Sequence, residues 1–217
     1  MIQLALVLDR RGAIGDERAG LLAVASLIPL ERLLVLSVPS LPFLRLYPSA
    51  LWVLPMMLVT AYAYRARWIP AARPRLLGPS GDRRWIHVAI QVGVVAVGGA
   101  LGITAAHTIH YAGSHVLIYP DVAKWSGAVL FALAGAIEEL AFRGVLQPLA
   151  ADVAGYAGIT ACFLASAYLA VTWMGPGAAL PVIVLSALTS VVVYRTRDLS
   201  GSLTAHAVLN LLLVTLR

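Results

Sequence analysis

Two glutamates and an arginine stand within an otherwise apolar stretch, GAIEELAFRGVLQPLA, at residues 135–150. An α-helix would place Glu139 and Arg143, four residues apart, on one face, with Glu138 rotated by about 100° from Glu139. One carboxylate can then pair with the guanidinium while the other serves proton transfer. Ionisable groups at membrane depth cost roughly 2.5 to 3.5 kcal/mol each, so they are retained mostly where they face a cavity or each other. The alternative is an ordinary buried ion pair beside a second glutamate that reaches the interface.

The last apolar run contains a second polar pair, His206 and Asn210, four residues apart in HAVLN. At 1.5 Å per residue, Glu138 lies roughly 14 Å from the helix end near Gln147. His206 and Asn210 lie about 9 Å and about 15 Å from the same side, so all three groups share one layer. Such a layer suits hydrolysis, because a carboxylate can take a proton from water while His and Asn donate to an oxyanion. The alternative is that His206 and Asn210 only join neighbouring helices.

The composition is that of a polytopic membrane protein. Of the 217 residues, 60% are hydrophobic and 12% are charged, whereas soluble domains have about 25% charged residues. The net charge is +6, but the basic residues separate apolar runs and form no patch suited to nucleic acid. The single cysteine, Cys162, excludes an intramolecular disulfide and a cysteine-based zinc site. Arginine outnumbers lysine 15 to 1, which indicates a GC-rich bacterial genome, and with this apolar composition we predict a protein of the bacterial cytoplasmic membrane.

We predict an all-α bundle of about seven transmembrane helices. Residues 1–123 would hold the N-terminal helices and a basic cytoplasmic loop, and residues 124–217 the catalytic core, within one integral membrane domain. In the third run, Gly93, Gly98, Gly99 and Gly102 suit close helix packing. The seven apolar runs are 19–40, 49–64, 85–106, 124–150, 156–174, 178–194 and 200–216.

The distribution of basic residues predicts the orientation. Residues 65–85 form a loop with six arginines, Arg65, Arg67, Arg73, Arg75, Arg83 and Arg84. With seven spans and an inner N-terminus, eleven Lys and Arg fall on inner segments and three on outer ones, with Arg32 and Arg143, which lie within spans, left aside. This asymmetry favours a cytoplasmic N-terminus and an outer C-terminus.

Three histidines, His107, His110 and His115, follow the third run. His107 and His110 could share a helical face, but no Asp, Glu or Cys lies close by before Asp121. We therefore interpret them as interfacial residues rather than as metal ligands. No cofactor, metal or nucleic-acid partner is expected, and the lipid bilayer is an expected partner; a membrane-anchored peptide or protein is the partner that the resemblance described next implies.

These motifs resemble those of the CPBP intramembrane glutamic endopeptidases, also called CAAX prenyl endopeptidases or Abi proteins. EELAFRG, from Glu138 to Gly144, is similar to the first motif of the family, and HAVLN is similar to the last. The resemblance covers roughly residues 124–217. It implies hydrolysis of a membrane-anchored or CAAX-like peptide by glutamate-activated water. It further implies these roles: Glu138 as base, Glu139 and Arg143 as a supporting pair, and His206 and Asn210 as oxyanion donors.

The chain departs from the family at its middle motif, a Phe followed four residues later by a His. One alignment places Ser166 and Ala170 there, and the other places Phe163 and Ala167. Neither supplies the histidine that helps the first glutamate to hold water. The residues nearby that could hold a water are Ser166, Tyr168 and Thr172.

Two other functions therefore stay open. A catalytically impaired pseudoprotease would bind a membrane partner or act as a scaffold without cutting it. A small transporter or proton pathway would use the same polar layer. A zinc enzyme is a weaker interpretation, because Glu138 and His206 fall short of the three protein ligands of catalytic zinc.

Overall fold

The structure is a computed structural model, and it describes residues 57, 60, 84–112, 124–174 and 176–216. Every regular element within these ranges is a helix, as predicted, and none is a strand. The predicted spans 19–40 and 49–64 and most of the loop 65–85 lie outside the described residues, apart from Met57 and Thr60. The all-helical class is thus confirmed for the described part of the chain, and the count of seven stays a prediction.

Two compact units make up the chain. One contains residues 1–73 and 140–162, and the other contains residues 74–139 and 163–217. The predicted division into residues 1–123 and 124–217 stays a prediction, since most of the first segment is outside the described ranges.

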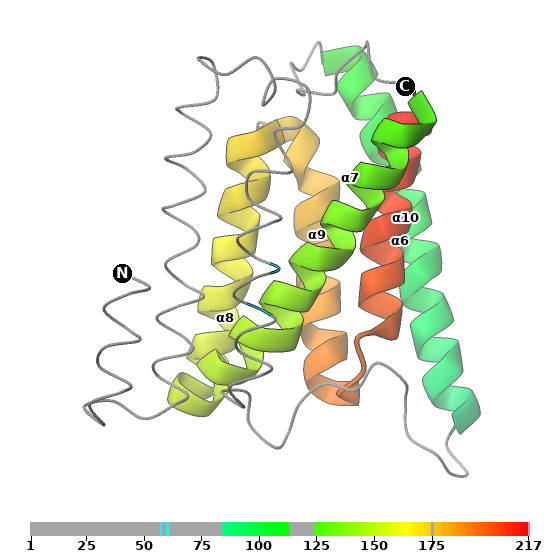
Figure 1. The fold of residues 1–217 in the computed structure, drawn as a ribbon. Helices are drawn as coiled ribbons and strands as arrows, with labels where there is room; N and C mark the ends of the chain where they lie inside the picture. Colours follow the sequence, from blue (N-terminus) through cyan, green and yellow to red (C-terminus); the bar gives the residue numbers. More distant parts are fainter. Residues whose placement is uncertain (1–56, 58–59, 61–83, 113–123, 175, 217) are drawn as a thin grey trace. The chain divides into compact units, whose positions relative to one another are not determined.

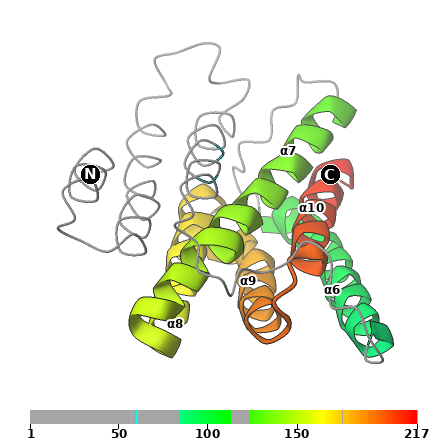
Figure 2. The same cartoon turned by 60° about the horizontal axis from the view of Figure 1, so that its bottom comes forward.

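The second unit is organised around α10, Ser200–Thr215. This helix packs against α6, Arg84–Ala112, against α7, Lys124–Glu139, and against α9, Pro176–Thr196. Figures 1 and 2 show α10 beside these three helices from two directions. The predicted runs 85–106, 178–194 and 200–216 are each confirmed as a helix. The end of the chain is therefore the element on which the unit is assembled.

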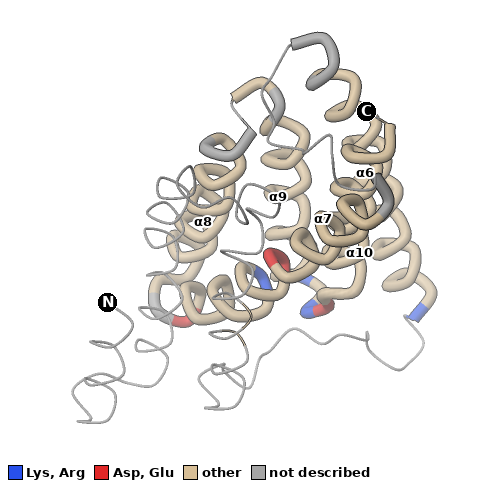
Figure 3. The backbone as a smooth tube through the Cα atoms, turned by 45° about the horizontal axis from the view of Figure 1, so that its top comes forward, with Lys and Arg blue, Asp and Glu red and all other residues tan. Residues whose placement is uncertain are grey.

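Three helical segments are long and apolar enough to cross a membrane, namely Arg84–Thr108, Ala154–Val171 and Ala179–Thr196. The helix Ser200–Thr215 is apolar but shorter. Lys, Arg, Asp and Glu are sparse along the described helices (Figure 3). An integral membrane location follows, because such helices satisfy their own backbone groups in lipid.

Threonine hydroxyls follow the same rule inside these helices. Six of those described donate a hydrogen bond to the carbonyl four residues earlier, at distances of 2.8 to 3.0 Å, and Thr189 donates to the carbonyl of Ser186, three residues earlier, at 3.3 Å. A polar hydroxyl then presents no unsatisfied donor to the hydrocarbon. The pattern is seen at Thr104, Thr108, Thr160, Thr196, Thr204 and Thr215.

Small residues bring α6 and α10 into backbone contact. A Cβ atom added to Gly98 would lie 2.6 Å from the carbonyl oxygen of Ala205. One added to Gly102 would lie 3.0 Å from the Cα atom of Leu209. The predicted packing role of these two glycines is confirmed, whereas Gly93 has nothing within 4 Å of such an atom.

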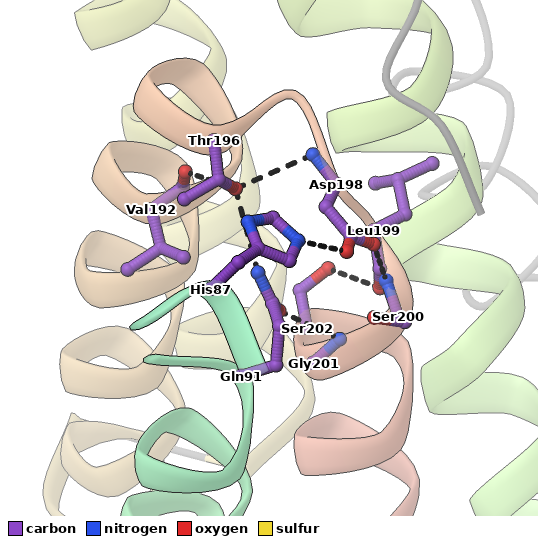
Figure 4. Close-up of polar contacts among 9 residues, drawn as sticks. All are labelled: His87, Gln91, Val192, Thr196, Asp198, Leu199, Ser200, Gly201 and Ser202. Carbon is purple, nitrogen blue, oxygen red and sulfur yellow. Dashed lines mark hydrogen bonds and ion pairs between the residues drawn. The ribbon is translucent and has the colours of Figure 1, made fainter. Parts of the chain in front are cut away.

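The connection from α9 to α10 is fastened to α6 by polar contacts (Figure 4). His87 Nε2 lies 2.5 Å from Oδ2 of the buried Asp198. The other carboxylate oxygen accepts a 2.8 Å hydrogen bond from the Ser200 amide at the start of α10. Gln91 Oε1 accepts a further bond, 2.9 Å, from the Gly201 amide. These contacts satisfy amide donors that a helix start leaves without intrahelical partners.

The first unit contains a change of helix type. After α7 ends at Glu139, the chain continues as a π-helix, Leu140–Leu146, and then as α8, Gln147–Met174. Residues 124–150, predicted as one continuous helix, are thus helical throughout but not α-helical throughout. The π-helix has i→i+5 hydrogen bonds, a pattern often found at functional sites.

A sharp bend interrupts α8 at Gly155, whose φ of 57° and ψ of −132° are not helical. A Cβ atom added to Gly158 would lie 1.9 Å from the carbonyl oxygen of Ala150. Eight residues of continuous α-helix would separate these positions by about 12 Å. The chain therefore reverses at Gly155, which agrees with the predicted boundary between the runs 124–150 and 156–174.

Candidate active site

Glu138 and Glu139 are the last two residues of α7, and they differ in their access to solvent. The side chain of Glu138 is 26% exposed, whereas that of Glu139 is 1% exposed. A carboxylate reached by water can act on it directly, while a buried one acts through its neighbours. The pair thus offers one group for reaction and one for support.

His206 of α10 lies between the two carboxylates. Its Nδ1 atom is 3.2 Å from Glu139 Oε1, within hydrogen-bonding distance, and its Nε2 atom is 3.7 Å from Glu138 Oε2. The imidazole is itself buried, with 7% of its side chain exposed. The shared layer predicted for Glu138 and His206 is therefore present in the structure.

The contact with Glu139 determines what the other edge of the ring can do. A carboxylate accepts hydrogen bonds, so it holds the proton of the imidazole on Nδ1. In the neutral ring, Nε2 then faces Glu138 with its lone pair, and in the imidazolium it faces Glu138 with a proton. A carboxylate that orients an imidazole in this way is a recurring arrangement in hydrolases.

Asn210 lies one turn after His206 and also faces α7. Its Nδ2 atom donates a 3.0 Å hydrogen bond to the carbonyl oxygen of Phe131. A carboxamide nitrogen carries two protons, so this bond uses one of its two donors. The role of Asn210 as an oxyanion donor stays a prediction, and it would use the second N–H donor of the carboxamide.

The sequence analysis missed two groups of α7 next to this site, the carbonyl of Phe131 and the backbone of Gly135. A Cβ atom added to Gly135 would lie 2.6 Å from Asn210 Nδ2 and 2.9 Å from His206 Cδ2. The available signal was the glycine one turn before Glu138 and Glu139 in GAIEE. A residue without a side chain at that place permits another helix to approach.

Arg143 lies in the other compact unit, on the π-helix Leu140–Leu146. It is 1% exposed, and its guanidinium carbon lies 5.8 Å from the centre of the Phe142 ring. The carbonyl of Phe142 in turn accepts a hydrogen bond from the thiol of Cys162, at 3.4 Å. The pairing of Glu139 with Arg143 stays a prediction. It assumed the spacing of a continuous α-helix, whereas the α-helix ends at Glu139 and Arg143 lies on the π-helix.

The place of the missing family histidine is occupied by small residues in either alignment. Ala170 is buried in an apolar core with residues of α6, α9 and α10, whereas Ala167 is half-buried. The hydroxyl of Ser166 lies 2.7 Å from that of Ser186 on α9. Tyr168 is 49% exposed. Of the side chains suggested as water holders, Ser166 is thus engaged with α9.

No group of three or more His, Cys, Asp or Glu side chains among the described residues is arranged to hold a metal ion. At this site the two ring nitrogens of His206 point to different carboxylates, so the three groups share no common centre. His107 is exposed, and its Nδ1 lies 2.8 Å from the Ile103 carbonyl of its own helix. The side chain of His110 and the whole of His115 lie outside the described residues.

Comparison with known proteins agrees with the motifs of this site. No curated protein and no solved structure matches the chain significantly. Residues 120–212 match the model of a protein family described as type II CAAX prenyl endopeptidase Rce1-like. This segment contains Glu138 and Glu139 of α7 and His206 and Asn210 of α10. Over residues 120–212, which are less than half of the chain, this protein is thus similar to the Rce1-like family of type II CAAX prenyl endopeptidases.

Proposed function

We propose that this protein is an intramembrane endopeptidase that hydrolyses a peptide bond of a membrane-anchored or CAAX-like substrate with a glutamate-activated water. The observation that carries the proposal is the position of His206 between a buried and a partly exposed carboxylate. A membrane-embedded protein has no evident structural need for two glutamates around one imidazole, because each ionisable group at that depth is costly. The similarity of residues 120–212 to the Rce1-like family supports the same chemistry.

The difference in exposure assigns the roles. Glu138, the accessible carboxylate, takes a proton from water, and the water oxygen bonds to the carbonyl carbon of the substrate. Glu139 holds the imidazole of His206 beside Glu138. The ring can then stabilise the charge that changes on Glu138 as this carboxylate takes the proton from water. The C–N bond then breaks, and Glu138 gives its proton to the departing amine. Asn210 has a second N–H with which to bind the oxyanion.

Replacement of the proposed base tests this function. Purified wild-type protein should cleave peptides with hydrophobic or lipidated C-termini, with the products identified by mass spectrometry. Glu138→Gln keeps the shape of the side chain but removes the base, so we expect the rate to fall by roughly 10²- to 10⁴-fold.

Asp152→Asn is the matched control, because it makes the same chemical change at an exposed carboxylate of α8. It should cleave at the wild-type rate. Cleavage by Glu138→Gln at that rate would contradict the proposed role of Glu138.

A pseudoprotease is the second candidate, and the packing of Ala170 favours it. This alanine belongs to the apolar core, so the imidazole that family members carry at this place is replaced by hydrocarbon contacts. The protein would then bind a substrate tail without cutting it.

This candidate predicts that a lipidated peptide cross-links to the wild-type protein, while neither the wild type nor Glu138→Gln releases a product. Turnover that depends on Glu138 would exclude it. A further test introduces a histidine at either aligned position, Ala170 or Ala167. If the protein is a pseudoprotease that lacks only this histidine, the substitution should restore cleavage. Ala170→His should cost stability, about 1–3 kcal/mol, because it buries a polar ring in the core, so Ala167→His at the half-buried place is needed beside it.

A further inference from the structure

Gly135 of α7 lies close to two polar side chains of α10, those of His206 and Asn210. A Cβ atom at this position would lie 2.6 Å from Asn210 Nδ2, 2.9 Å from His206 Cδ2 and 3.2 Å from His206 Cγ. Gly135 is also three residues before Glu138 and four before Glu139, so all three face the same side of α7 within one turn. The imidazole and the carboxamide therefore lie directly over the helix backbone at Gly135.

Neither side chain of α10 can move away without loss of a contact. Rotation of Asn210 would break its hydrogen bond to the Phe131 carbonyl, and rotation of His206 would break its bond to Glu139. A methyl group at position 135 would thus be accommodated only by displacing one of these groups or the whole of α10. The added methyl group would therefore clash with His206 and Asn210 of the candidate site, and not with a flexible side chain on the surface.

The hydrogen bond of Asn210 gives a second reason for a glycine. In an α-helix the carbonyl of Phe131 accepts from the amide of Gly135, four residues later. Asn210 uses the remaining lone pair of that carbonyl, 3.0 Å away. A side chain at position 135 would cover this carbonyl, so its absence leaves the acceptor open to α10.

We propose that Gly135 is a positioning residue of the site, which permits His206 and Asn210 to lie against α7 with the imidazole between Glu138 and Glu139. Gly135 touches no substrate and acts only through these side chains. The catalytic consequence rests on the proposed function, whereas the effect on the imidazole does not.

The test compares Gly135→Ala with Gly93→Ala, a matched control at a glycine that has nothing within 4 Å of an added Cβ atom. The full-length protein is labelled with ¹⁵N in its histidine rings, and the His206 resonances are assigned by their loss in His206→Gln. Gly135→Ala should shift the His206 resonances, because the hydrogen bond to Glu139 changes, and Gly93→Ala should not. Cleavage by Gly135→Ala should fall on the order of 10²-fold, as expected for a misplacement near 1 Å.

A second measurement covers the case in which Gly135→Ala folds poorly. Asn210→Ala removes the atom closest to the added methyl group, so Gly135→Ala should lower the melting temperature less in the Asn210→Ala background than in the wild type. Equal losses in both backgrounds, or unchanged His206 resonances in a folded Gly135→Ala protein, would overturn the proposal. If the wild type cleaves nothing, only the proposed function fails, because the resonances and the melting temperatures still decide the role of Gly135.

Discussion

At the scale of single residues, the site is a carboxylate, an imidazole and a second carboxylate in a row. Glu139 is almost fully buried and bonds Nδ1 of His206, whereas Glu138 is partly exposed and faces Nε2. Burial removes water as a competing partner, so the contact between Glu139 and His206 is strong and directional. The two glutamates, adjacent in sequence, therefore have different roles.

Glu139→Gln should reduce cleavage by roughly 10²- to 10⁴-fold with little change in KM. The amide is similar in shape, but it can turn its NH₂ group toward Nδ1 and place the ring proton on Nε2. The measurement is kcat and KM for a lipidated peptide, together with the melting temperature. A variant that is as stable as the wild type and retains its kcat would show that Glu139 does not orient the imidazole.

At the scale of elements, the position of α10 depends on polar contacts at its start and in its middle. Its start is held to α6 by the pair of His87 with Asp198 and by the bond from Gly201 to Gln91 (Figure 4). Just before it, Arg197 has a φ of 57°, a conformation that costs energy in residues with a side chain. Two turns later, His206 enters the site, so a shift at the start would be transmitted along the helix.

His87→Ala should lower the free energy of unfolding by about 1.5–3 kcal/mol, because it leaves a buried carboxylate oxygen of Asp198 without its partner. Unfolding in detergent, followed by circular dichroism, measures this loss.

His107→Ala is the matched control for this variant, since His107 is exposed and bonds only a carbonyl of its own helix among the contacts described. It should change stability by no more than about 0.5 kcal/mol. Equal effects of the two substitutions would show that the contact with Asp198 does not hold α10.

At the scale of the whole molecule, the distribution of basic residues in the sequence predicts how the chain is oriented in the membrane. The excess of Lys and Arg on one set of segments favours a cytoplasmic N-terminus and an outer C-terminus. An odd number of spans is needed for the two ends to lie on opposite sides. The orientation also determines on which side of the membrane a substrate reaches Glu138.

Fusion of a reporter to the C-terminus tests this orientation. Alkaline phosphatase, which requires an oxidising compartment, should be active when fused after Arg217, and a fluorescent protein that folds only in the cytoplasm should stay dark. The reverse pattern would contradict the predicted topology. A fusion within the arginine-rich loop at residues 65–85 is the internal control and should give the opposite result to the C-terminal fusion.

The sequence by itself determined the class of the protein and most of the helices of the described part. Hydrocarbon requires every backbone donor to be satisfied within its own segment, so long apolar runs such as 85–106 and 178–194 have to be helices. The motifs around Glu138 and His206 likewise depend on residue type and spacing. The depth of each group follows from the rise of 1.5 Å per residue, which is why the common layer could be predicted.

Only the tertiary structure decided which groups in that layer meet. Glu139 bonds His206, 67 positions away, and the spacing of residues along one helix carries no information about a partner on another. The burial of Ala170 in the apolar core and the close approach at Gly135 are likewise results of packing between segments. The physical reason is that periodicity describes one helix at a time, while a site made by two helices depends on their rotation and separation.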